Sequence, residues 1–208
     1  PGTLTSSQAL DETKNNFLMG IVYLGDCFGI ASCDITTGDF FVTEVQSERE
    51  LLDELAHFTP SEIVCNQAFF MSGIDMDELK NRCQAYVSAL DPRFFSDDGC
   101  RRILKEHYRV ASLDGLGHCP TGVIAAGAVM QYMYETQKSD LSHITSITPY
   151  STGQYMVLDV STRRNLELLE TLREKQKRGT LLWVLDKTRT AMGARLLRSF
   201  IEQPLIRK

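Results

Sequence analysis

Residues 17–45 read FLMGIVYLGDCFGIASCDITTGDFFVTEV, and this stretch holds three apolar runs separated by two short polar turns. Gly25-Asp26 is a tight-turn dipeptide, and residues 36–39 (TTGD) form the second turn. Apolar runs joined by turns this short are typical of an antiparallel meander. We therefore predict three consecutive strands, at residues 17–24, 28–35 and 40–45.

The chain after residue 45 changes to helical spacing. Ser47 is a candidate helix N-cap with Glu50 as its capping-box partner, and Leu51, Leu55 and Phe58 fall on one helical face. The further predicted elements are strands at 62–65 and 86–90, and helices at 75–83, from Asp97 or Asp98 to about 108, and from Pro120 to 137. The last of these helices is rich in Gly and Ala, which permit close packing.

Three antiparallel strands followed by alternating helices and strands give an α/β order. We predict a ribonuclease-H-like mixed sheet flanked by helices, followed by a mainly helical partial core domain. A stretch rich in Ser, Thr, Pro and Gly at 146–154 marks the change between the two. We therefore divide the chain into a first domain at 1–138, a linker at 139–154 and a second unit at 155–208.

The second unit is predicted to contain a short strand at 155–158 and two helices. The first helix is capped by Asp159 or Ser161 and extends through an apolar set of leucines at 166–172, and the second spans 190–202. This unit is too short to close a core of its own, so we expect its apolar faces to pack against further chain. The lack of an initiator Met agrees with a piece of a longer protein.

The net charge of −5 is unevenly spread along the 208 residues. Residues 1–158 hold 10 Lys and Arg against 21 Asp and Glu, whereas residues 159–208 hold 12 against 6. The acidic first part is a poor candidate for binding the phosphates of a nucleic acid, because such binding relies on Lys and Arg. The six cysteines form no C-x-x-C pair, which predicts free buried thiols and not a zinc site.

No apolar run approaches the roughly 20 residues that a bilayer-spanning helix needs. The N-terminal residues have neither the basic region nor the apolar region of a secretion signal. We therefore expect a cytoplasmic protein without membrane contact.

A ribonuclease-H-like sheet raises the alternative of a degenerate nuclease. Two-metal phosphoryl chemistry needs clustered carboxylates, yet residues 17–24 contain none, and turn chemistry explains Asp34 and Asp39 better. The adjacent His118 and Cys119 are interpreted as part of a loop leading into a helix. A third interpretation is a nucleic-acid-binding module that uses the basic C-terminal part. No phosphate-binding glycine motif occurs, so we predict no catalytic, cofactor or metal residues.

Two blocks in the last third of the chain are distinctive. Residues 156–168 read MVLDVSTRRNLEL, residues 180–197 read TLLWVLDKTRTAMGARLL, and Pro204-Leu205 follows. In order and spacing they resemble the blocks that open the core domain of the MutS family of bacterial DNA mismatch-repair proteins. Residues 29–38 and 125–137 resemble the connector domain of the same family, whereas residues 66–118 match it only loosely.

The resemblance implies that residues 1–138 are the connector domain and 155–208 the start of the core domain. Full-length members bind mismatched double-stranded DNA as homodimers and bind ATP with Mg, through regions outside this fragment. The connector is expected to couple the ATPase state to DNA binding and to offer a surface to the partner protein MutL. The fragment itself is expected to be no enzyme.

Particular residues follow from this resemblance. Arg101 and Arg102 are candidates for the partner contact. Arg163, Arg164 and Asn165, expected in the first turn of a helix, are candidates for a domain junction, since arginine forms forked hydrogen bonds. Residues 200–202 spell the Phe-x-Glu of the family's mismatch-reading wedge, but they fall in a predicted helix, where we expect Phe200 to be core.

Overall fold

Side chains of the first strand, β1 (Phe17–Leu24), alternate between two hydrophobic cores. In the computed structural model, Leu18 and Val22 join one buried cluster, whereas Met19 and Ile21 join the other. Successive side chains of a strand point to opposite faces of its sheet. An apolar run without polar interruptions therefore indicates a strand that is covered on both sides. The structure describes residues 16–83, 85–137, 140–152, 156, 158, 160–202 and 204–206.

The three predicted N-terminal strands are confirmed. β1 pairs antiparallel with β2 (Cys27–Asp34), which pairs antiparallel with β3 (Asp39–Val45). The first hairpin turns at Gly25 and Asp26, which have φ angles of +58° and +62°. Two successive residues with positive φ match the twist of the flanking strands, so the dipeptide sets the register of the hairpin.

Two parallel strands extend the sheet beyond β1. β4 (Glu62–Cys65) pairs with β1, and β5 (Tyr86–Ala89) pairs with β4. On the opposite edge, the short β6 (Thr148–Pro149) runs parallel to β3, giving the order β5-β4-β1-β2-β3-β6. This mixed sheet confirms the predicted ribonuclease-H-like fold class. The strand β6 was not predicted, and it lies within the stretch 139–154 that we expected to be a linker.

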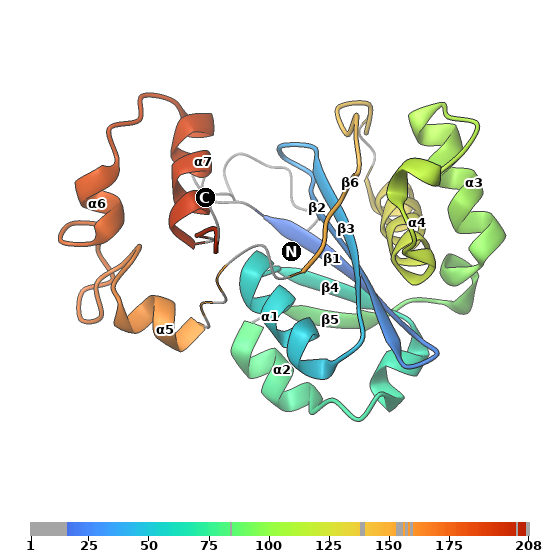
Figure 1. Cartoon of the computed structure of the whole chain (residues 1–208), viewed down its shortest axis with the longest axis horizontal. Helices are drawn as coiled ribbons and strands as arrows, with labels where there is room; N and C mark the ends of the chain where they lie inside the picture. The colour runs from blue at the N-terminus through green and yellow to red at the C-terminus, as the bar shows by residue number, and fades with distance from the viewer. Residues whose placement is uncertain are drawn as a thin grey trace.

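Helices cover both faces of the sheet (Figure 1). One face carries α1 (Glu48–Phe58) and α2 (Met76–Cys83), and the other carries α4 (Pro120–Thr136) with α3 (Asp97–Tyr108) against it. Single turns of 3-10 helix join these elements at Gln67–Met71, Pro92–Phe95 and Asp114–Leu116. The helices α1, α2, α3 and α4 were predicted, with shifts of a residue or two at their ends, whereas the 3-10 turns were not.

The helix caps confirm one prediction and correct another. The Ser47 hydroxyl accepts a hydrogen bond from the N–H of Glu50 over 3.2 Å, and the Glu50 carboxylate accepts one from the Ser47 N–H, so the capping box is present. The cap of α3 is Ser96, whose hydroxyl accepts from Gly99 N–H, and not Asp97 or Asp98. Both carboxylates lie in the first turn instead, where their negative charge interacts favourably with the positive end of the helix dipole.

The small residues of α4 allow it to lie close to its neighbours, as predicted. A Cβ atom added at Gly127 would lie 2.2 Å from the Cβ of Cys100 on α3. A Cβ added at Gly29, on β2, would lie 2.2 Å from the carbonyl oxygen of Thr121. Neither distance is sterically possible for a side chain, so glycine is required at both contacts.

The C-terminal unit contains three short helices, α5 (Val160–Asn165), α6 (Leu181–Leu185) and α7 (Ala191–Glu202). Its small hydrophobic core consists of Leu168, Leu182 and Ile201, with a few partly buried leucines around them. Trp183 of this unit is exposed. The packing of its apolar faces against further chain stays a prediction. In Figure 1 these helices stand apart from the sheet.

Three predictions for this unit were wrong or lie outside the described residues. The first helix does not extend through the leucines at 166–172. It ends at Asn165, because Glu167 has a positive φ and its carbonyl accepts from Leu181 N–H. Of the predicted strand, Met156 and Leu158 are not in a strand, and residues 155 and 157 are outside the described chain. Phe200 is 64% exposed and is not core.

None of the helices in the described part of the chain combines the length and the apolarity needed to cross a bilayer.

Candidate functional site

Residues 140–150, here called the exit segment, connect the end of α4 to β6 and on toward α5. The segment begins with a tight turn in which the Asp140 carboxylate accepts from the N–H of Ser142 over 2.9 Å and from its hydroxyl over 2.7 Å. These two bonds hold the pKa of Asp140 below its usual value. Leu141 and Ile144 are buried in the core beneath α4. The segment is therefore packed as part of the sheet domain.

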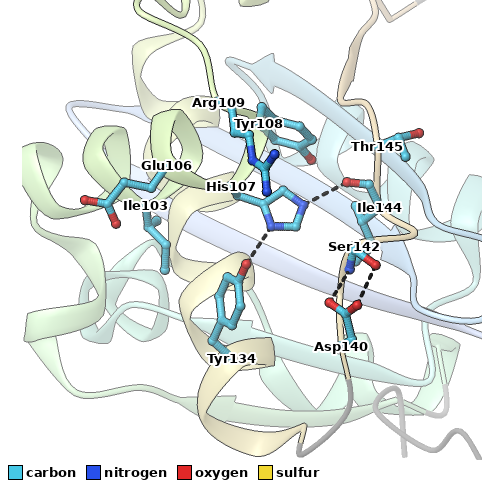
Figure 2. Close-up of a pocket in the computed structure, with 10 residues that line it drawn as sticks. All are labelled: Ile103, Glu106, His107, Tyr108, Arg109, Tyr134, Asp140, Ser142, Ile144 and Thr145. Carbon is cyan, nitrogen blue, oxygen red and sulfur yellow. Dashed lines mark hydrogen bonds between the residues drawn. The ribbon is translucent and has the colours of Figure 1, made fainter.

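His107, in the last turn of α3, joins three elements (Figure 2). Its Nε2 lies 2.7 Å from the carbonyl oxygen of Ile144, and its Nδ1 lies 2.7 Å from the hydroxyl of Tyr134 on α4. A carbonyl oxygen only accepts, so Nε2 carries the hydrogen. In the neutral ring Nδ1 then accepts from Tyr134, and the imidazole links α3, α4 and the exit segment.

A second histidine holds the same segment to the turn between β2 and β3. The Nε2 of His143 donates to the carbonyl oxygen of Ile35 over 2.6 Å. Gly38, in that turn, has a φ of +80°, and an added Cβ would lie 2.6 Å from the carbonyl oxygen of His143. The turn and the exit segment are therefore in close backbone contact.

The far end of the exit segment is bound to β3 and α1. Tyr150 N–H donates to the carbonyl of Val42, and the Thr43 hydroxyl donates to the carbonyl of Tyr150 over 2.8 Å. The Tyr150 hydroxyl donates to Glu54 Oε2 over 2.5 Å. Glu54 is only 6% exposed, and the Nδ1 of His57 lies 3.3 Å from the same oxygen. A buried carboxylate with two partners thus anchors the segment to α1.

A pocket of about 750 Å³ opens beside His107. Its wall is formed by the last turn of α3, Tyr134 and the first half of the exit segment (Figure 2). The hydroxyl of Tyr108 in this wall is buried and has no hydrogen-bond partner among the described residues, and burial raises the pKa of that tyrosine. The wall of the pocket thus combines aromatic rings, two carboxylates and one arginine.

The two arginines predicted to contact a partner lie on α3, the helix that carries His107. The Nε of Arg101 donates to Asp97 over 2.8 Å, and its side chain is 39% exposed. Arg102 is exposed. Arg102 is therefore the freer candidate for a partner contact, because Arg101 already has an acidic neighbour.

The predicted junction residues lie elsewhere in their helix than expected. Arg163, Arg164 and Asn165 form the last turn of α5 and not its first. Arg163 is half-buried, while Arg164 and Asn165 are exposed. The carbonyl of Arg163 accepts from the N–H of Leu168 over 3.4 Å, and the carbonyl of Arg164 accepts from the N–H of Glu167 over 3.0 Å. Their role at a domain junction stays a prediction.

The carboxylates considered for a nuclease are held by turns, as predicted. Asp34 accepts from Thr36 N–H over 2.8 Å and from its hydroxyl over 2.6 Å, and Asp39 accepts from the hydroxyl of Thr37 over 2.6 Å. Cys119 is buried and donates to the carbonyl of Leu116. Within the described residues, no three His, Cys, Asp or Glu side chains are grouped to hold a metal ion.

Sequence reasoning did not identify the anchors of the exit segment. His107 contacts a carbonyl 37 residues away, and Tyr150 contacts a carboxylate 96 residues away. His107 and His143 both hold the segment through a backbone carbonyl, and every residue possesses such a group. No local pattern could therefore have singled out these positions.

Comparison with known proteins supports the resemblance. The family model for MutS domain II matches residues 16–145, and that for MutS domain III matches residues 161–208. The DNA mismatch repair protein MutS of Lachnoclostridium phytofermentans is 60% identical over 99% of this chain, which corresponds to 22% of that relative. The MutS of Ruminiclostridium cellulolyticum is 46% identical, again over 99% of this chain and 24% of the relative. The chain thus spans about a quarter of the length of the curated relatives it matches.

Proposed function

This chain belongs to the MutS family of DNA mismatch repair proteins, and we propose that its sheet domain is a connector that transmits conformational change between neighbouring domains. In the complete protein it would couple the ATPase state to the binding of mismatched double-stranded DNA. That protein would bind ATP with Mg, form a homodimer and work in the cytoplasm. The part described here would relay motion and would not catalyse a reaction.

The observation that carries this proposal is the attachment of the exit segment. Over eleven residues it is bound to α3, to the β2–β3 turn, to β3 and to α1. A linker meant to isolate two domains would be free of such contacts, because interdomain motion is the default where few contacts cross. Here a displacement of the chain after residue 150 pulls directly on the sheet and on two helices.

The test is a flexible insertion in the full-length protein. A Gly-Gly-Ser insertion after Thr152 lengthens the connection just beyond the exit segment, and the same insertion after Ala111, in an exposed bend, is the matched control. We expect the first insertion to reduce the ratio of mismatched-DNA affinities measured without and with ATP. ATP hydrolysis without DNA should be preserved. An unchanged affinity ratio would contradict the proposal.

We propose further that the outer surface of α3 contacts MutL. Arg102 and Lys105 are exposed there, and other residues of the same helix, including Ile103 and Glu106, line the pocket beside His107. Arg102→Glu should weaken MutL binding, since reversing an interfacial charge leaves like charges opposed. Arg189→Glu, an exposed reversal on the C-terminal unit, is the control. Equal MutL affinities for the two variants would remove Arg102 from the contact.

A further inference from the structure

We infer that His107 is the positioning residue through which α3 sets the place of the exit segment, an inference that rests on the proposed connector function. Both ring nitrogens are used, one toward Tyr134 on α4 and one toward the carbonyl of Ile144. His107 therefore provides a direct polar link from the surface of α3 to the chain that leaves the domain.

The link is sensitive to small movements of α3. A hydrogen bond of 2.7 Å loses most of its strength when its atoms separate by about 1 Å. The Ile144 side chain is 1% exposed, so the residue itself is fixed in the core. A shift or fraying of the last turn of α3 consequently lengthens this hydrogen bond, and one support of the exit segment is lost.

The end of α3 is exposed to a binding partner. The helix ends at Tyr108 and is capped by Arg109, which has a φ of +54° and whose N–H donates to the carbonyl of Lys105. Lys105, Glu106 and Arg109 are exposed, so a partner that binds α3 meets this turn directly. The pocket of about 750 Å³ gives a bound side chain access to the His107–Tyr134 pair (Figure 2).

His143 supplies the contrast that makes the inference testable. It holds the same segment through an equally short hydrogen bond of 2.6 Å, but its partner is Ile35 at the β2–β3 turn. Removing the His143 imidazole should loosen the exit segment without disconnecting it from α3. Removing the His107 imidazole should loosen the exit segment and also disconnect it from α3.

The experiment is a double-mutant cycle in the full-length protein, followed by hydrogen exchange of the amides at 141–145. Lys105→Gly weakens the last turn of α3, since glycine in a helix costs roughly 1 kcal/mol, or about a fivefold change in an equilibrium. We expect Lys105→Gly to speed exchange of the exit segment about fivefold in the parent and in the His143→Phe background. In the His107→Phe background the same change should produce less than a twofold effect.

His107→Gln is the rescue variant, because its amide can donate to Ile144 and accept from Tyr134. It should restore the response to Lys105→Gly, and thermal melts of every variant report whether the domain is folded. Equal responses in the His107→Phe and His143→Phe backgrounds would overturn the inference. The ATP-dependent change in DNA affinity is measured on the same proteins. The exchange response to Lys105→Gly could depend on His107 while the ATP-dependent change in DNA affinity persists in His107→Phe. That result would support the link between α3 and the exit segment and contradict the connector function.

Discussion

The carboxylate of Glu44, on β3, accepts a hydrogen bond of 3.0 Å from the backbone N–H of Thr121, in the first turn of α4. The same oxygen lies 3.4 Å from the nitrogen of Gly122. The residue at the N-cap position of α4, Cys119, provides no side-chain cap. Because the first N–H groups of a helix lack intrahelical partners and carry partial positive charge, a strand residue here completes the helix.

Glu44→Ala should therefore destabilise the domain. It removes the acceptor for two part-buried N–H groups, and loss of a helix cap costs about 1–2 kcal/mol of unfolding free energy. Glu44→Gln keeps an acceptor but loses the charge, so its effect should be smaller. Urea denaturation followed by circular dichroism measures both. Glu106→Ala, at an exposed helical position, is the control and should change stability by less than about 0.5 kcal/mol.

The Cys27 thiol gives a chemical readout of the same carboxylate. Burial, and secondarily the nearby Glu44 carboxylate, raises the pKa of Cys27 to about 12, while the thiol donates to the carbonyl of Val45. The thiol should therefore react slowly with iodoacetamide near pH 8, because the thiolate is the nucleophile. Glu44→Gln should increase the rate, and Cys27→Ser in the same background identifies the reacting residue. An alkylation rate unaffected by Glu44→Gln would show that this carboxylate does not control the thiol.

Buried thiols also predict how stability changes with pH. Burial raises the pKa values of Cys65 and Cys100 to about 12, so folding favours their neutral forms. This contribution is complete below the unfolded-state pKa of about 8.5 and is lost as pH rises from there toward 12. The urea concentration at the midpoint of unfolding should therefore decrease when the pH is raised from 8 to 10. Cys100→Ala should reduce the slope of that fall even though it lowers stability at pH 7.

Two glycines on neighbouring helices should respond oppositely to alanine. Gly127→Ala would place its Cβ 2.2 Å from the Cβ of Cys100, so α3 and α4 must separate. Overpacking of this kind costs about 1–3 kcal/mol. Gly99→Ala meets only Ser96, at 3.5 Å, and should stabilise α3 by roughly 0.5–1 kcal/mol because alanine favours helices. Thermal melting of both variants tests the pair, and equal shifts would contradict the close packing.

The parts of the fold that sequence predicted are those fixed by local chemistry. The Gly25-Asp26 hairpin and the Ser47 cap each depend on residues within a few positions of one another. The family resemblance located the second unit, but it could not show that α5 ends at Asn165 or that Phe200 is exposed. Those outcomes depend on which other segments lie nearby.

The exit segment escaped prediction for a related reason. β6 has only two residues, and it is a strand because the edge of β3 is available to it. Ser, Thr and Pro in this region indicate a loop by composition, whatever the loop packs against. Its attachment to His107 and Glu54 joins residues far apart in the chain. Such contacts follow from tertiary structure alone.

The bond between Tyr150 and Glu54 gives a test of how firmly the exit segment is held. Tyr150→Phe removes the hydroxyl that donates to Glu54 Oε2 over 2.5 Å. Glu54 is only 6% exposed, and it then retains the Nδ1 of His57 at 3.3 Å from the same oxygen. Leaving a buried acceptor short of a partner costs about 1–3 kcal/mol. Tyr23→Phe removes an exposed hydroxyl bonded to Asp26 and should cost less than about 0.5 kcal/mol.

Glu54→Gln completes a double-mutant cycle with Tyr150→Phe. If the two groups act together, the double variant should be more stable than the sum of the single losses predicts, since each change removes the same bond. Hydrogen exchange of the Tyr150 amide, which donates to the carbonyl of Val42, should speed up in each single variant, because the far end of the segment opens without the anchor. Additive losses, or a Tyr150→Phe variant as stable as Tyr23→Phe, would mean that α1 does not hold the exit segment.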